Sequence, residues 1–303
     1  SASVFFLSVL HALHDSFRKL RSFVFIERIS EVTDIFEHER DFRRIAERVS
    51  SGRRDALQAA AVEVLETALV QFIGDPRMHH LARDLLAHAR ELVNRLAIQD
   101  SVELNLLGTV ARYDAIGGAY RSAESLYRRQ VHAARRLLGS DHPTTLSLQR
   151  TLAQVLRAVG ALHDAKALLE EVVAGFEALR DINRSDLGSA LNDLGLVLRE
   201  LGHSAGAEAK FERALGIYRF VYGPEHFEVA AVLNNLGMVQ RDFGRLRAAA
   251  ATYQQALDIK ERFYDEHAVE LATTLNNLAL VREDLGELST ARELIERALQ
   301  IEE

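Results

Sequence analysis

The chain contains no cysteine and no tryptophan, and only three of its 303 residues are proline. The lack of cysteine excludes disulfides, thiolate zinc sites and cysteine nucleophiles, and it fits the reducing cytoplasm. Scarce proline, together with abundant Ala, Leu, Arg and Glu, predicts helix throughout. No stretch is apolar over the length of a membrane span, and the most apolar one, residues 4–10, lacks a basic leader. We therefore expect neither a membrane helix nor a signal peptide.

The composition is that of a globular protein with a substantial core, since 48% of the residues are hydrophobic and 27% are charged. A net charge of −7 argues against a nucleic-acid-binding surface spread over the molecule. The sequence has no glycine-rich phosphate loop, no Gly-x-Ser-x-Gly motif and no paired carboxylates. These absences predict a protein that is not an enzyme and needs no cofactor.

One pattern recurs every 42 residues over the last two thirds of the chain. A glycine is followed five residues later by alanine and nine residues later by a large apolar residue. The glycines are Gly118, Gly160, Gly202, Gly244 and Gly286, the alanines Ala123, Ala165, Ala207, Ala249 and Ala291, and the apolar residues Tyr127, Leu169, Phe211, Tyr253 and Ile295. A fixed period of this size indicates one structural unit copied head to tail.

Residues 227–264 show what one unit contains. Apolar side chains at helical spacing predict a first helix over 227–243 and a second over 245–264. Gly244 lies between them and provides the backbone freedom that a helix C-terminus needs. Each unit is therefore predicted to be a pair of antiparallel helices.

Three motifs in register resemble a tetratricopeptide array: Leu-Asn-Asp-Leu-Gly at 191–195, Leu-Asn-Asn-Leu-Gly at 233–237 and Leu-Asn-Asn-Leu-Ala at 275–279. The 42-residue period exceeds the usual 34, and with Tyr-Gly-Pro-Glu-His at 222–226 it is similar to the kinesin light chain type of repeat. The resemblance implies an all-α, right-handed superhelical array of antiparallel helix pairs, an α-solenoid, with five repeats over 101–303. Bacterial proteins with this repeat often carry a nucleotide-binding switch domain or a caspase-like protease, and neither is visible in these residues.

Residues 1–100 show helical periodicity without the 42-residue pattern. We predict four helical segments at about 3–28, 30–50, 53–73 and 76–98, the last two forming a degenerate repeat over 53–98. Because the first repeat has no upstream neighbour, this region is expected to be a helical cap and linker. An enzyme site within 1–100 is the least favoured alternative.

The last predicted helix poses the converse problem. Nothing downstream of it in these residues would cover Leu294, Ala298, Leu299 and Ile301. We expect either that the natural protein continues past Glu303 or that this face is buried in a homo-oligomer.

In arrays of this kind the first helices line the concave side, and residues spaced i, i+4, i+7 share a face. This spacing predicts an asparagine column, an apolar column and a charged column, which would suit an extended peptide. They are Asn192, Asn234 and Asn276; Leu196, Met238 and Leu280; and Arg157, Arg199, Arg241 and Glu283. The apolar column would hold peptide side chains, and the arginines would bind a carboxylate in bidentate fashion.

The family resemblance implies that the three asparagines clamp peptide backbone, because an amide both donates and accepts. An alternative is that they hydrogen-bond to the adjacent repeat; Asn235 and Asn277 are expected to serve packing or loop anchoring between repeats. The arginines could likewise only solvate the surface beside Glu200 and Asp242.

Two other patterns are of residue types that bind ligands. His80, Asp84 and His88 share a helix face, but a metal site usually needs a ligand from another element, so no metal site is predicted. A basic stripe could contact an acidic partner or nucleic acid; it comprises Arg128, Arg129, His132, Arg135 and Arg136.

These observations together predict a protein- or peptide-binding module, the sensor or scaffold part of a larger bacterial cytoplasmic regulator. The main alternative is a module for self-association or autoinhibition of a switch protein. No membrane or nucleic-acid partner is expected.

Overall fold

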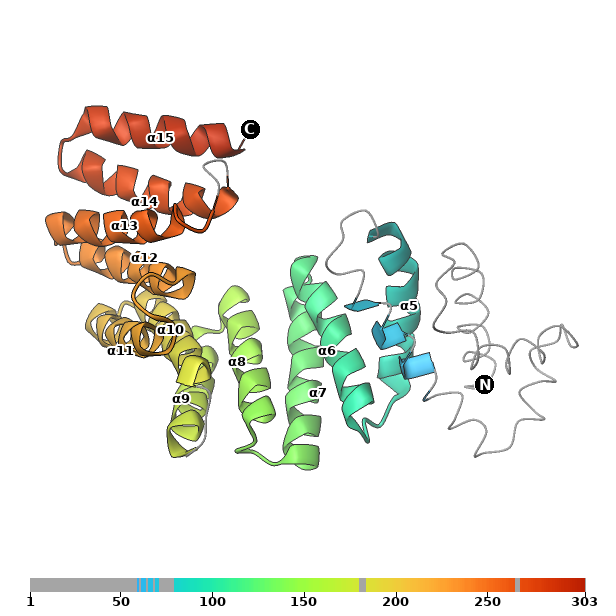
Figure 1. The fold of residues 1–303 in the computed structure, drawn as a ribbon. Helices are drawn as coiled ribbons and strands as arrows, with labels where there is room; N and C mark the ends of the chain where they lie inside the picture. The colour runs from blue at the N-terminus through green and yellow to red at the C-terminus, as the bar shows by residue number, and fades with distance from the viewer. Residues whose placement is uncertain are drawn as a thin grey trace, which may run out of the picture. The chain divides into compact units, whose positions relative to one another are not determined.

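The computed structural model describes residues 59, 61–63, 65–67, 69–70, 79–179, 184–264 and 268–302. From residue 79 on, these residues form a succession of helices joined by short turns (Figure 1). The helices are α5 (His79–Arg95), α6 (Ser101–Ile116), α7 (Tyr120–Leu138), α8 (Pro143–Ala158), α9 (Leu162–Ala178), α10 (Arg184–Glu200), α11 (Ser204–Tyr222), α12 (Phe227–Asp242), α13 (Leu246–Lys260), α14 (Val269–Asp284) and α15 (Leu288–Glu302). No helix in the described ranges is long and apolar enough to cross a membrane.

The chain divides into two compact units, residues 1–137 and 138–303. Three of the helical segments predicted in the first hundred residues, 3–28, 30–50 and 53–73, lie wholly or mainly outside the described residues. The fourth, 76–98, corresponds to α5. The role of residues 1–100 as a cap stays a prediction.

In the N-terminal unit, the basic stripe on α7 holds the turn that follows α5. The Arg129 guanidinium donates to the carbonyl oxygen of Val93 at 2.8 Å, and Arg136 donates to that of Ala97 at 3.2 Å. Arg128 pairs with Glu124 along its own helix. These contacts give the stripe a structural role, because basic side chains at a helix C-terminus satisfy its last carbonyl groups.

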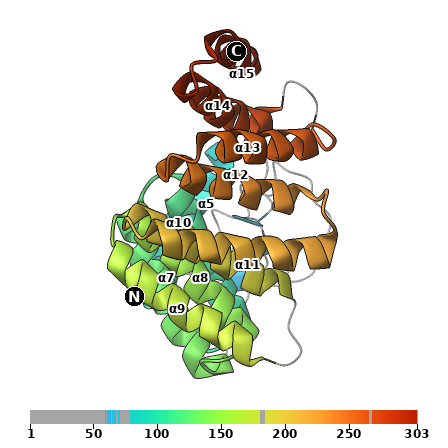
Figure 2. The same cartoon turned by 90° about the vertical axis from the view of Figure 1, so that its left-hand side faces the viewer.

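In the C-terminal unit, consecutive helices pack as pairs and the pairs stack in chain order (Figures 1 and 2). The predicted helix ends agree with this, because Gly244 has a positive φ of 70° immediately after the first helix of its pair. Its N–H donates to the carbonyl oxygen of Arg241, and the Arg245 N–H donates to that of Gln240. This hydrogen-bond pattern is a Schellman motif, and it recurs after α8, α10 and α14.

The core of each repeat is an interlock of small and large residues. Tyr253 is 1% exposed and packs among Leu271, Leu275 and other residues of the next pair. Its ring also lies against Gly237 of its own pair, where an added Cβ would come within 2.8 Å of the ring. Burying such a ring contributes about 2–3 kcal/mol, so glycine at this position permits one of the strongest contacts in the repeat.

The prediction that the face of the last helix, α15, is uncovered is wrong for three of its four residues. Ala298 and Ile301 are 2% and 8% exposed, and Leu294 packs on the core, because these residues face α14 of their own pair. Leu299 is 53% exposed, as expected. Ile295 is 39% exposed, although its equivalent Tyr253 is buried.

We predict that Gly237→Ala lowers the free energy of unfolding by about 1–3 kcal/mol, because the methyl group overpacks the rigid Tyr253 ring. Gly216→Ala is the matched control, since Gly216 is an exposed helical glycine with no heavy atom within 4 Å of an added Cβ. That control should raise stability by about 0.5–1 kcal/mol through helix propensity. Urea unfolding followed by circular dichroism distinguishes the two, and equal stabilisation by both would refute the interlock.

Candidate functional site

The first helices of the C-terminal unit, α8, α10, α12 and α14, are joined by side-chain contacts between residues 43 positions apart. Asn235 Nδ2 donates to Asn192 Oδ1 at 2.8 Å, and Asn277 Nδ2 donates to Asn234 Oδ1 at 3.2 Å. At the equivalent place one step earlier, Arg150 Nη1 donates to Asp193 Oδ2 at 3.0 Å. We call these contacts, with the ion pairs below, the inter-helix ladder. They confirm that chemically matching residues of successive repeats line up in space.

The asparagine column takes part in the ladder with its oxygens. Asn192 and Asn234 accept from the next helix through Oδ1, and no residue in the described ranges accepts from their Nδ2 groups. Asn234 is 8% exposed, Asn192 is half-buried and Asn276 is exposed. At Asn192 and Asn234, therefore, a bound peptide would meet a donor rather than a complete amide.

Each arginine of the charged column pairs with a carboxylate of the following helix. Arg157 donates to Glu200 at 2.6 Å and Arg241 to Asp284 at 2.7 Å. Arg199 binds Asp242 through two hydrogen bonds, of 2.6 and 3.2 Å. The hydrogen bond with its carboxylate raises the pKa of Arg199, and Asp284 raises that of Arg241 in the same way. A peptide carboxylate would have to displace a partner that is already bound.

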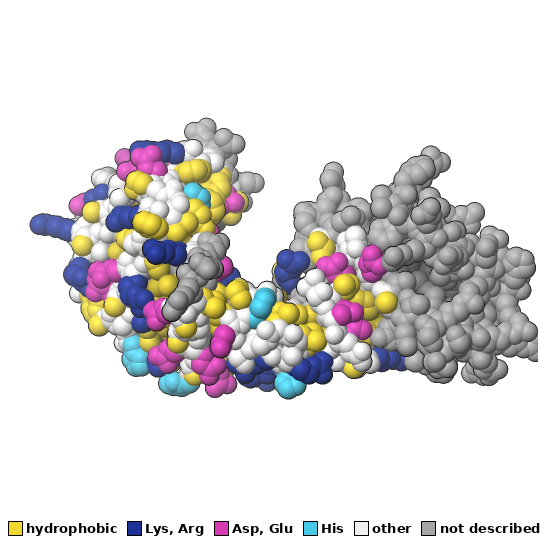
Figure 3. All heavy atoms as spheres, turned by 60° about the horizontal axis from the view of Figure 1, so that its bottom comes forward, with side chains coloured by type: hydrophobic (Ala, Val, Ile, Leu, Met, Phe, Trp, Pro, Cys, Tyr) yellow, Lys and Arg dark blue, Asp and Glu magenta, His cyan; other side chains and the backbone are white. Residues whose placement is uncertain are grey.

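The C-terminal unit accordingly shows acidic and basic side chains next to one another on the face drawn in Figure 3. Glu283, which continues the charged column, is exposed and has no ion-pair partner among the described residues.

The apolar column is accessible, and it is longer than the three residues predicted from the sequence. Leu196 and Met238 are half-buried and Leu280 is 40% exposed. Phe227 and Val269, which are 41% and 67% exposed, lie seven residues before Asn234 and Asn276 on the same helix faces. The i, i+7 spacing would have found both residues if it had been extended one step toward the helix start.

Asp193 is the unusual member of the ladder. Its side chain is 12% exposed and accepts from Arg150 and Gln154, whereas the equivalent residues of the next two repeats are Asn235 and Asn277. Burial raises the pKa of the Asp193 carboxyl, and this effect exceeds the opposing effect of Arg150. The ion pair therefore does not fully compensate for removing the carboxylate from water.

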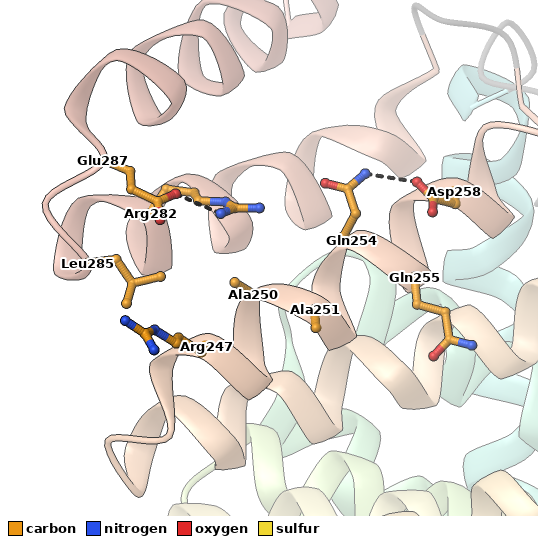
Figure 4. Close-up of a pocket in the computed structure, with 9 residues that line it drawn as sticks. All are labelled: Arg247, Ala250, Ala251, Gln254, Gln255, Asp258, Arg282, Leu285 and Glu287. Carbon is orange, nitrogen blue, oxygen red and sulfur yellow. Dashed lines mark hydrogen bonds and ion pairs between the residues drawn. The ribbon is translucent and has the colours of Figure 1, made fainter.

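A separate depression of about 540 Å³ lies between α13 and the turn that joins α14 to α15 (Figure 4). Two pairs of its polar side chains bond to each other, Gln254 with Asp258 at 2.8 Å and Arg282 with Glu287 at 2.6 Å. No residue of the three columns lines it. The depression is therefore not part of the candidate groove. Within the described ranges, no three His, Asp or Glu side chains lie close enough together to hold a metal ion.

We predict that Asp193→Asn changes how stability depends on pH. The folded-state pKa of Asp193 is above its unfolded value, so this residue's stabilising contribution is complete below the unfolded pKa and is lost as pH rises through the folded pKa. The variant does not lose stability in this way, because an amide side chain does not ionise. Its stability relative to the wild type should therefore increase with pH above about 4 and then level off.

Urea unfolding of both proteins at a series of pH values checks this difference. Asp258→Asn, at an exposed position of a second helix, provides the background slope. A difference between the Asp193→Asn variant and the wild type that does not vary with pH would contradict the prediction.

Comparison with known proteins agrees with this architecture. The family model described as tetratricopeptide repeat matches residues 102–178, 186–262 and 251–303. The crystal structure of BtubC (BKLC) from P. vanneervenii is 22% identical with a TM-score of 0.59, covering 80% of this chain and 91% of that one. A putative kinesin light chain from Podosopora anserina with nearly identical TPR-like repeats is 23% identical with a TM-score of 0.55, covering 66% of this chain and 94% of that one. These identities establish a shared fold only.

A search of curated protein sequences finds no match. The family match nevertheless spans more than half of the chain, and its first two ranges each cover two helix pairs, α6 to α9 and α10 to α13. The chain therefore belongs to the tetratricopeptide repeat family.

Proposed function

We propose that the chain is a non-catalytic module that binds an extended segment of a protein partner along α8, α10, α12 and α14. Tetratricopeptide repeats generally mediate contacts between proteins. The observation that carries the proposal is the column of asparagine amides at Asn192, Asn234 and Asn276, which stands beside the accessible apolar column. Two of these amides keep an unused donor, and a main-chain carbonyl of a bound segment is a matching acceptor.

The small free energies of the individual contacts limit the affinity of such a groove. Three amide contacts contribute about 1 kcal/mol each, and one apolar side chain on the Leu196–Met238–Leu280 column contributes about 2 kcal/mol. These gains must offset the ordering of the peptide. We therefore expect micromolar binding, which suits a regulatory contact that forms and dissolves. We place the module in a bacterial cytoplasmic regulator as its sensor or scaffold part.

We predict that the triple variant Asn192→Ala/Asn234→Ala/Asn276→Ala weakens peptide binding tenfold or more, about 1.4 kcal/mol. The probe is the best binder from an array of immobilised unstructured peptides, measured in solution by fluorescence anisotropy with the full chain. The matched control is Asn235→Ala/Asn277→Ala, which removes the donors of the ladder but leaves the column in place. Equal losses in both variants would assign the asparagines to packing and would refute the clamp.

A second candidate function is self-association through α15, because the positions that face the next repeat inside the array are uncovered there. Leu299 is 53% exposed whereas its equivalent Leu257 is 2% exposed, and Leu288 is 65% exposed. We propose a second copy of this chain as the occupant, because a two-fold arrangement covers the same face of both copies at once.

We predict that Ile295→Glu/Leu299→Glu lowers the average mass in sedimentation velocity at high protein concentration, because buried carboxylates at the contact oppose association. Ser289→Glu/Gln300→Glu adds the same charge at other exposed positions of α15 and should leave the mass unchanged. A wild-type protein that stays monomeric over the whole concentration range would exclude this second function.

A further inference from the structure

We infer that the groove selects a cationic segment, one rich in lysine or arginine with at least one aliphatic side chain. This inference rests on the proposed function and names the class of partner. The four first helices, α8, α10, α12 and α14, hold six arginines, eight carboxylates and no lysine.

Five of the six arginines are ion-paired within the chain, and the sixth lies against an aromatic ring. Four belong to the inter-helix ladder, where each meets a carboxylate of the next helix; the pairs are Arg150–Asp193, Arg157–Glu200, Arg199–Asp242 and Arg241–Asp284. The Arg184 guanidinium lies over the Phe220 ring at 5.1 Å, and Arg282 pairs with Glu287 of the following turn. Arg184 therefore keeps a positive charge without a carboxylate partner in the described ranges, but it lies in the first turn of α10, outside the three columns.

Four carboxylates of the same helices have no ion-pair partner among the described residues. They are Asp186, Glu228, Glu270 and Glu283. Helical spacing places Glu228 and Glu270 on the faces of the ladder residues Asn235 and Asn277, and it places Glu283 on the face of Asn276. A cation already lies beside Glu270, because Lys260 Nζ donates to the main-chain carbonyl oxygen of Glu270 at 2.8 Å. The carboxylate among these whose own turn holds no such cation is Glu228, so the charge along the columns that no ion pair balances is mainly negative.

A purely structural explanation covers only part of this set. Asp186, Glu228 and Glu270 lie in the first turns of their helices, where a carboxylate interacts favourably with the helix dipole. Glu283 lies in the last turn of α14, where the dipole disfavours it, and it replaces the arginine that the period would put there.

A second observation that points to a ligand is the side-chain amide of Asn234. Asn234 is nine-tenths buried, its oxygen is bonded to Asn277, and no described residue accepts from its nitrogen. A main-chain carbonyl of the segment would satisfy this donor, while the segment's side chains reach the carboxylates on either side.

The surroundings of Glu228 suit a long cationic side chain in particular. Its neighbour Phe227 is 41% exposed and lies beside His226, whose ring stacks on that of Tyr222 at 4.3 Å between centroids. On the neighbouring helix face, a lysine or arginine would meet the exposed Phe227 ring, and aromatic faces attract cations. Its methylene stem would cover apolar surface such as that of Phe227.

The test uses three acetylated and amidated peptides that share the same leucine positions and carry lysine, serine or glutamate at the others. Anisotropy titrations with the full chain should rank lysine above serine above glutamate, and the advantage of the lysine peptide should shrink as salt is added. Glu228→Gln/Glu270→Gln should weaken binding of the lysine peptide about fivefold, the expected size for two partly exposed ion pairs. It should leave binding of the serine peptide unchanged.

The matched control is Glu212→Gln/Glu293→Gln, which makes the same change of net charge at exposed positions of α11 and α15. An equal loss in this control would reduce the effect to net charge and would overturn the inference. If the serine or glutamate peptide binds best and still depends on the three asparagines, the cationic preference is wrong and the groove stands. If no peptide binds, both proposals fail together.

Discussion

The register between successive repeats is the constraint on which the rest of the C-terminal unit depends. A residue of one first helix meets the residue 43 positions later, one more than the period, because the contact runs sideways to the next helix. Asn192 and Asn235, Asn234 and Asn277, and Arg199 and Asp242 all obey this offset. A helix displaced by one residue would separate every one of these pairs at once, so the ladder makes the register unambiguous.

The ladder sets the register without supplying most of the stability. The Arg199 and Asp242 side chains are 32% and 35% exposed, and ion pairs with this degree of exposure contribute about 0.2–1 kcal/mol. Burial of Tyr253 beside Gly237 contributes more, about 2–3 kcal/mol. Stability therefore comes mainly from the small-to-large interlock, and the polar contacts decide which of several apolar alignments is adopted. This division explains how the polar residues differ between repeats, as at Arg150 and Asp193, while the interlock positions stay small or large.

The helix pairs, their glycine-terminated ends and the buried face of each first helix could be predicted from the sequence, because each depends on local spacing. The partners of the polar residues could not. Helical spacing shows that Arg199 and Asn234 lie on an accessible face, but it does not show whether they reach a ligand or the next helix. A search for complementary residues at an offset of 43 would have found Glu200, Asp242 and Asp284. The misassigned face of α15 has the same origin, since Ala298 and Ile301 face their own pair and only contacts in space distinguish that side from the next.

This sideways pairing distinguishes the polar residues that hold a repeat array together from those that are available to a partner. A polar side chain whose partner stands 43 residues away serves the array, and the arginine column satisfies this criterion completely. Under the proposed function, the groups available to a partner are those that this offset leaves unmatched within the described residues, namely the Asn192 and Asn234 donors and the carboxylate of Glu228. These groups combine hydrogen-bond donors for main chain with negative charge for side chains. An array whose arginines were unpaired would favour an acidic ligand. Here the column arginines form ion pairs with the next first helix, and these pairs fix the register. If the proposed groove binds a segment, its specificity is thus a consequence of how the repeats hold one another in place.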